Sequence, residues 1–120
     1  MQTLLFILWS ISIEVLAPCK AWINTKKTDQ AVVVTGYCRS MISETAAYRY
    51  ELYLLRRGPG GQSANNQQGR FELGPGQTTT LSEVRLNFDE RTSVVGQLRI
   101  LDAAGHLVAQ DSIRHTATHP

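Results

Sequence analysis

The chain has 120 residues, of which 42% are hydrophobic and 18% charged, and this is enough for one domain with a packed core. The formal net charge is only +2, and no run of Lys and Arg is long enough to follow a phosphate backbone. The composition therefore excludes a dedicated nucleic-acid-binding protein. The mild positive charge fits an acidic or polar partner instead.

The N-terminal segment has the composition of an export signal. Its apolar run extends from Leu4 to Leu16, which is long enough for a signal peptide but too short and interrupted for a membrane span. We predict a signal peptide over residues 1–17, a folded domain over 18–114 and a flexible tail over 115–120. The chain is thus expected to be exported, without stable membrane insertion.

The two cysteines flank the first two predicted strands, which cover residues 20–24 and 31–37. In a hairpin centred between Thr28 and Asp29, Cys19 lies directly opposite Cys38, within reach of a disulfide. An oxidising compartment would let this bond close. The alternatives are a redox-active pair, although catalytic dithiols usually form a Cys-x-x-Cys motif, and free thiols or lipidation of Cys19.

The middle of the chain contains a strand followed by a polar stretch. Residues 48–57 alternate, with apolar side chains on one face and Arg49, Tyr53 and Arg57 on the other. Gly, Pro and Asn interrupt residues 58–69 at nearly every step, and we predict a long loop there. A fourth strand is expected to begin at Arg70 and to end at a tight turn over 74–76.

Three further strands are predicted over residues 78–88, 93–102 and 107–113, each with alternating apolar residues. In the second of these, Leu98 and Ile100 are expected to point inward, and Arg99 and Leu101 outward. About seven strands at hairpin spacing, without a β-α-β unit, predict an all-β fold. The expected architecture is an antiparallel β-sandwich of immunoglobulin-like type.

The sequence offers few groups for catalysis. His106 lies in a predicted turn, and His115 and His119 lie in the predicted tail, where no helical pattern supports their i, i+4 spacing as a metal site. The glycines over 58–61 lack the Lys and Ser/Thr that a phosphate-binding loop requires. We therefore expect no enzyme, no cofactor and no metal.

The arginines have two interpretations. Scattered Arg and Glu residues are typical of a solvated sheet face. Alternatively, Arg and Tyr together form a basic surface for transient contact with another chain, because they supply charged donors and rigid amphipathic area. The candidate binding residues are Arg49, Tyr53, Arg56, Arg57, Arg70 and Arg99.

Several short motifs resemble the CsgC/CsgH-like curli chaperones, and more closely the CsgH branch. The likeness covers roughly residues 19–113. The motifs are Tyr48-Arg49-Tyr50-Glu51-Leu52, Gly60-Gly61-Gln62-Ser63, Gln68-Gly69-Arg70-Phe71-Glu72-Leu73, Pro75-Gly76 and Leu81-Ser82.

This resemblance implies a periplasmic chaperone, monomeric and independent of ATP, whose partner is the major curli subunit. It implies weak, electrostatically guided contacts that prevent premature amyloid formation. The Cys-x-Cys motif of the CsgC branch is absent, so no redox role is carried over from it. The competing hypotheses are a secreted structural or adhesive module, and a thiol-disulfide oxidoreductase that uses Cys19 and Cys38.

Overall fold

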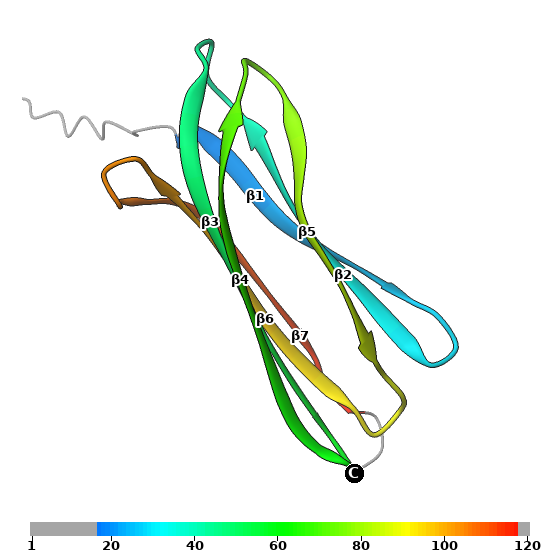
Figure 1. Ribbon diagram of the computed structural model, residues 1–120. Helices are drawn as coiled ribbons and strands as arrows, with labels where there is room; N and C mark the ends of the chain where they lie inside the picture. The colour runs from blue at the N-terminus through cyan, green and yellow to red at the C-terminus, as the bar shows by residue number, and fades with distance from the viewer. Residues whose placement is uncertain (1–16, 118–120) are drawn as a thin grey trace, which may run out of the picture.

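The computed structural model describes residues 17–117 and forms two antiparallel sheets packed face to face (Figure 1). One sheet has the order β1-β2-β5 and the other the order β4-β3-β6-β7. The strands are β1 (Cys19–Lys27), β2 (Ala31–Ser40), β3 (Ala46–Gly58), β4 (Gly61–Leu73), β5 (Thr78–Asn87), β6 (Ser93–Asp102) and β7 (Leu107–His115). The predicted all-β sandwich is confirmed.

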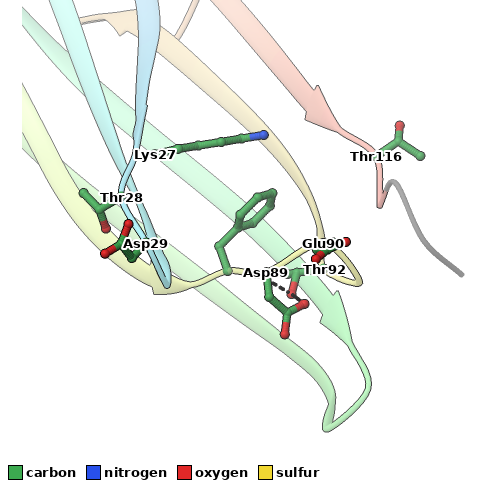
Figure 2. A pocket seen from close by; sticks show the side chains of 8 residues that line it. Lys27, Thr28, Asp29, Asp89, Glu90, Thr92 and Thr116 are labelled. Carbon is green, nitrogen blue, oxygen red and sulfur yellow. Dashed lines mark hydrogen bonds between the residues drawn. The ribbon is translucent and has the colours of Figure 1, made fainter.

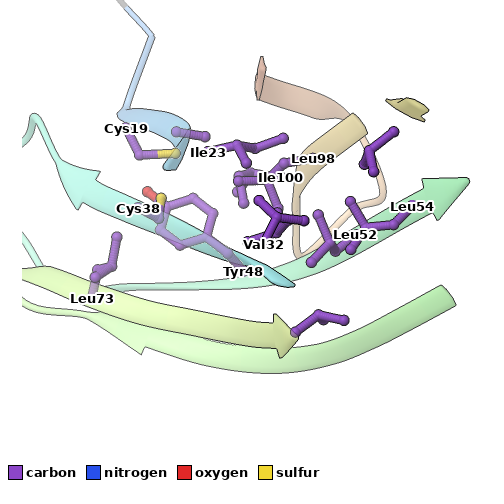
Figure 3. Packing of buried hydrophobic residues seen from close by; sticks show 14 residues of the cluster. Cys19, Ile23, Val32, Cys38, Tyr48, Leu52, Leu54, Leu73, Leu98 and Ile100 are labelled. Atoms are coloured by element: carbon purple, nitrogen blue, oxygen red, sulfur yellow. The ribbon is translucent and has the colours of Figure 1, made fainter. Parts of the chain in front are cut away.

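The core lies between the sheets and contains the residues that alternate inward from each strand (Figure 3). Leu52 and Leu54 of β3 are fully buried, as their alternation predicted. Such side chains contribute most of the stability of a small domain, because each removes its whole apolar surface from water. The other buried members include Val32, Val34, Val84, Val94, Leu98 and Ile100.

The predicted loop over residues 58–69 is wrong. β3 and β4 have 13 residues each and pair from Gly58 opposite Gly61 to Ala46 opposite Leu73, so that only Pro59 and Gly60 turn the chain. The polar side chains of β4 do not prevent a strand, because pairing with β3 satisfies the backbone along its whole length. A prediction based on apolar alternation could not detect such a strand.

Two details of the later strands add to the predictions. Leu101 pairs with Arg49 on the outer face of the sheet, as its predicted outward direction requires, but its side chain is buried there. β7 extends to His115, which pairs with Val94, two residues beyond the predicted end of the last strand.

The predicted signal peptide falls outside the described residues except for Ala17, and His119 falls outside them as well. Within residues 17–117 no helix is long and apolar enough to cross a membrane.

The two open sides of the sandwich differ. On one side β1 and β7 are joined, because the Ile23 amide donates a hydrogen bond of 2.9 Å to the Asp111 carboxylate. A second bond of 3.1 Å joins Thr25 Oγ1 and His115 Nε2. On the other side β4 and β5 are the sheet edges, and the Ser82 hydroxyl donates a hydrogen bond to Gln67 across the gap. β4 is therefore a sheet edge that the opposite sheet covers little.

Candidate functional site: the outer face of the four-stranded sheet

The outer face of the four-stranded sheet is polar and rich in arginine. We call it the arginine face. Its side chains lie in rows across the strands, because residues that pair in antiparallel strands point to the same side. Gln68, Glu51, Arg99 and Gln110 form one such row. The arginine face comprises Arg49, Glu51, Tyr53, Arg57, Asn66, Gln68, Arg70, Gln97, Arg99, Gln110 and Arg114.

Tyr53 lies near the middle of this face, and its side chain is 42% exposed. It pairs with Asn66 on one side and Gln97 on the other. Together with Glu51, Gln68 and Arg99 these residues line a shallow hollow of about 220 Å³. An aromatic ring surrounded by amides suits a polar extended chain better than a compact apolar ligand.

The charges on the arginine face are unevenly neutralised. Arg99 Nη1 lies 3.2 Å from Glu51 Oε1, so this pair neutralises itself. Arg49 donates only to the neutral amide of Gln68, at 3.4 Å. Among residues 17–117, no carboxylate lies within 4.0 Å of the guanidinium of Arg49, Arg57 or Arg70. These three positive charges remain available to a partner.

Five of the six predicted binding residues share the arginine face. They are Arg49, Tyr53, Arg57, Arg70 and Arg99. Arg99 lies on the strand next to β3, as expected for an immunoglobulin-like sheet. Whether these residues bind a client stays a prediction.

Arg56 does not share this face. It follows Leu52 and Leu54 in the inward alternation of β3, and its Nε donates a hydrogen bond of 2.6 Å to the main-chain oxygen of Asn87. Arg56 therefore anchors the β3–β4 hairpin to the end of β5. It therefore lies outside the arginine face, and whether it contacts a client stays a prediction.

Sequence reasoning missed the amides of the arginine face. Asn66 and Gln68 lie on it because β4 is a strand, whereas a loop gives side chains no common direction. The signal was available as a run of Gln and Asn over residues 65–68 followed by an alternating segment, but it lacked the apolar partners that mark a strand.

A second feature, a half-buried aromatic pair, lies on the outer face of the three-stranded sheet. Trp22 and Tyr37 pair across β1 and β2, and their rings stack with centroids 5.4 Å apart and an interplanar angle of 20°. Exposed Lys20, Arg39 and Arg85 lie on the same face. This face is also basic, which makes it a matched reference for experiments on the arginine face.

The cysteines are close together, but not in the predicted register. Cys19 pairs with Ser40, and Cys38 with Ala21, so the hairpin is centred one residue later than expected. Both side chains are buried (Figure 3), no disulfide joins them in this structure, and they lie within hydrogen-bonding reach of each other. The Cys19 thiol and burial raise the pKa of Cys38, whereas the interaction with Cys38 lowers the pKa of Cys19. A disulfide between them stays a prediction.

One hollow, of about 280 Å³, lies between the β1–β2 and β5–β6 connections (Figure 2). The Lys27 ammonium lies 4.9 Å from the centre of the Phe88 ring. The Asp89 carboxylate accepts hydrogen bonds from the Arg91 amide and the Thr92 hydroxyl, and these bonds lower its pKa. These groups stabilise the turn and are not arranged for catalysis. Within residues 17–117 no three metal-binding side chains are grouped.

No protein-family model matches the chain, and no curated protein matches it either. A comparison with solved structures finds the curli protein CsgC of E. coli with a TM-score of 0.65 and 18% identity, over 78% of this chain and 96% of that one. The fold is that of CsgC. CsgH of R. palustris is also similar, with a TM-score of 0.60 and 17% identity over 77% of this chain and 89% of that one.

A β-glucuronidase of Bacteroides uniformis has a TM-score of 0.58 and 11% identity, and the likeness covers 83% of this chain but only 14% of the enzyme. At such identities the likenesses show the fold alone. CsgC and CsgH differ from the enzyme because this chain spans nearly their whole length. They support the resemblance to the CsgC/CsgH family that the sequence motifs predicted.

Proposed function

We propose that this protein is a periplasmic chaperone that delays amyloid formation by an exported, curli-type subunit. It acts through brief contacts at the arginine face and has no catalytic activity. The fold likeness to CsgC and CsgH supports a curli-related role. The observation that carries the proposal is that Arg49, Arg57 and Arg70 share a face with exposed Tyr53 and have no carboxylate partner among residues 17–117.

The physical basis is electrostatic steering followed by a weak contact. Unpaired cations on one face raise the rate at which an acidic or polar chain is encountered. Exposed charge pairs and hydrogen bonds contribute little net affinity, so the bound chain leaves again. Amyloid growth begins when strand edges of different chains pair. A contact that interrupts these first pairings delays fibres without ATP and at less than one chaperone per subunit.

A structural or adhesive module is the first alternative. It has the same fold and needs no effect on amyloid formation. A thiol-disulfide oxidoreductase is the second, and the thiols argue against it. A redox thiol must form an accessible thiolate, whereas Cys19 and Cys38 are both buried. These buried thiols are better suited to packing or to a structural bridge.

The test is the lag time of fibre formation by the subunit, followed with an amyloid-binding dye. The variant R49E/R57E/R70E reverses the three unpaired charges of the arginine face. The control K20E/R39E/R85E makes the same change in net charge at exposed positions of the three-stranded sheet. We expect the wild type and the control to delay fibres, and the first variant to lose most of the delay.

Equal delay by both folded variants would contradict the assignment of the arginine face. If the wild-type protein itself caused no delay, the structural or adhesive alternative would be favoured. Added salt provides a second readout, because screening at about 1 M reduces the Debye length to about 3 Å. We expect the delay caused by the wild type to shorten under these conditions.

A further inference from the structure

β4 is a long, regular and uncovered edge strand. It pairs with β3 over all 13 of its residues without a register shift, and it lies at the end of its sheet. Natural sheets usually protect such edges with Lys, Pro, bulges or covering segments. β4 contains neither Lys nor Pro, and all its outward positions from Gln62 to Glu72 are exposed.

The other edges are protected. β7 and β1 cover each other through the hydrogen bonds of Ile23 with Asp111 and of Thr25 with His115. β5 carries alternating charges, Glu83 and Arg85, and its pairing with β2 contains an irregularity. The unprotected stretch is therefore residues 61–69 of β4, because the two charges of this strand, Arg70 and Glu72, lie beyond it. Its backbone groups on the free side are open to water, and another extended chain could pair with them instead.

The side chains of β4 indicate which chain fits. Gln62, Asn66 and Gln68 are amides on the outer side, and Asn65 and Gln67 are amides on the inner side. When amide side chains lie opposite one another in register, they form ladders of hydrogen bonds. An added strand with Gln or Asn at matching positions would form such a ladder with the outer amides of β4.

The charges near β4 disfavour a basic partner strand. Arg70 on β4 and Arg49 on β3 pair directly across the strands, and neither has a carboxylate within 4.0 Å among residues 17–117. A partner strand with Lys or Arg on its outer side would be repelled. A neutral strand would not be, and an acidic one would be attracted at Arg49 and Arg70 although not beside Glu72.

We propose that β4 binds an extended segment rich in Gln and Asn and lacking Lys and Arg, by adding it as a fifth strand to the four-stranded sheet. The inference rests on the proposed function for the statement that the amyloid-forming subunit carries this segment. Strand addition at β4 occupies one edge of the segment's backbone, and that edge is then no longer available for pairing with another subunit. The arginine face steers the chain to the edge.

The probe for this site is a capped, uncharged peptide in which Gln alternates with Thr, and its control has Lys in place of two Gln residues. Binding is measured by protection of individual backbone amides of the full protein from solvent exchange. We expect the probe to protect β4 amides while β6 and β1 amides stay unchanged. The Lys-containing peptide should give no protection.

A matched pair of variants separates the edge from the face. Asn66→Lys and Gln97→Lys add the same charge in the same row, on either side of Tyr53. Asn66 lies on the free edge strand, whereas Gln97 lies on β6, which is paired on both sides. We expect Asn66→Lys to weaken peptide binding by about tenfold or more, and Gln97→Lys to weaken it by about twofold at most.

Protection of β4 that is abolished by Asn66→Lys supports strand addition even if the wild type fails to delay fibres, in which case only the proposed function is wrong. Protection elsewhere, or equal weakening by the two variants, overturns strand addition. A wild type that delays fibres without any protection of β4 retains the proposed function and overturns the edge site.

Discussion

β4 has two parts that are stabilised in different ways. Over residues 70–73 its inner side chains belong to the core, because Leu73 is fully buried and the Phe71 ring lies 5.6 Å from the ring of Tyr48. Over residues 61–69 the inner side chains include Ser63 and Asn65, which are polar. The first nine residues of β4 are therefore a strand mainly because β3 pairs with them. Because residues 61–69 contribute little to the core, their side chains and their free edge can be used for binding.

The largest loss of stability is expected from a substitution in the apolar part of β4, residues 70–73. Replacing Leu73 by Ala removes a fully buried side chain and should reduce the free energy of unfolding by about 3 kcal/mol. Ser63→Ala in the polar part should change it by less than about 0.5 kcal/mol. Denaturant unfolding of both variants measures the difference. Similar losses would show that the two parts of β4 are stabilised alike.

The same contrast explains how much of the fold the sequence could predict. Strands over a core alternate visibly, and Leu52, Leu54, Leu98 and Ile100 were all predicted on the buried side. The fourth strand was predicted only from Arg70 onward, where Phe71 and Leu73 restore the alternation. The pairing that forms the rest of β4 is a tertiary interaction and leaves no periodic signal in the sequence.

The candidate site was predictable to a similar degree. Strand alternation brings Arg49, Tyr53 and Arg57 to one face, and this was visible in the sequence. The inward direction of Arg56 follows from the same alternation, but its proximity to the presumed loop obscured it. The ion pair of Arg99 with Glu51 depends on the β3–β6 register, which no local pattern contains.

The second largest loss of stability is expected at Gly69, where the apolar and polar parts of β4 meet. A Cβ atom there would lie 2.8 Å from Tyr50 Cε1, so the ring must move. We expect Gly69→Val to destabilise the protein by about 1–3 kcal/mol. A Cβ at Gly60 meets nothing within 4 Å, so Gly60→Ala is the control and should be nearly neutral. If calorimetry gave equal melting temperatures for both variants, the close packing at Gly69 would be refuted.

A smaller change, and an increase in the free energy of unfolding, is expected from a substitution in the polar part of β4, residues 61–69. Asn65 Oδ1 is buried and has no hydrogen-bond partner among the described residues, which is unfavourable by about 1–3 kcal/mol. Asn65→Val should therefore stabilise the fold by about 1 kcal/mol. Asn66→Val, on the exposed side of the same strand, should have little effect. A clear loss of stability in Asn65→Val would mean that the amide has a partner.

The smallest expected effect is the loss of stability in acid. This loss should not involve the β3–β4 hairpin. The Asp102 carboxylate accepts hydrogen bonds from the His106 and Ala104 amides, which lower its pKa. The bonds of Asp89 lower its pKa as well. A lowered pKa contributes stability above the unfolded value of about 3.9, and this is lost as the pH falls through the folded value.

Both carboxylates lie in turns that flank β6, whereas the β3–β4 turn consists of Pro59 and Gly60 and has no titratable group. Asp102→Asn should therefore flatten the dependence of stability on pH below about 4, without changing amide exchange in β4. An unchanged pH profile in this variant would contradict the role of the turn.

The central claim is that the four-stranded sheet, through its arginine face and the edge at β4, contacts the amyloid-forming subunit. Titration of the isotope-labelled protein with the monomeric subunit, followed by NMR chemical shifts, tests it most directly. We predict shifts at Tyr53, Asn66 and Gln97, with the Trp22 indole signal unchanged. Shifts centred on Trp22 and Tyr37, with none on β3 or β4, would contradict it.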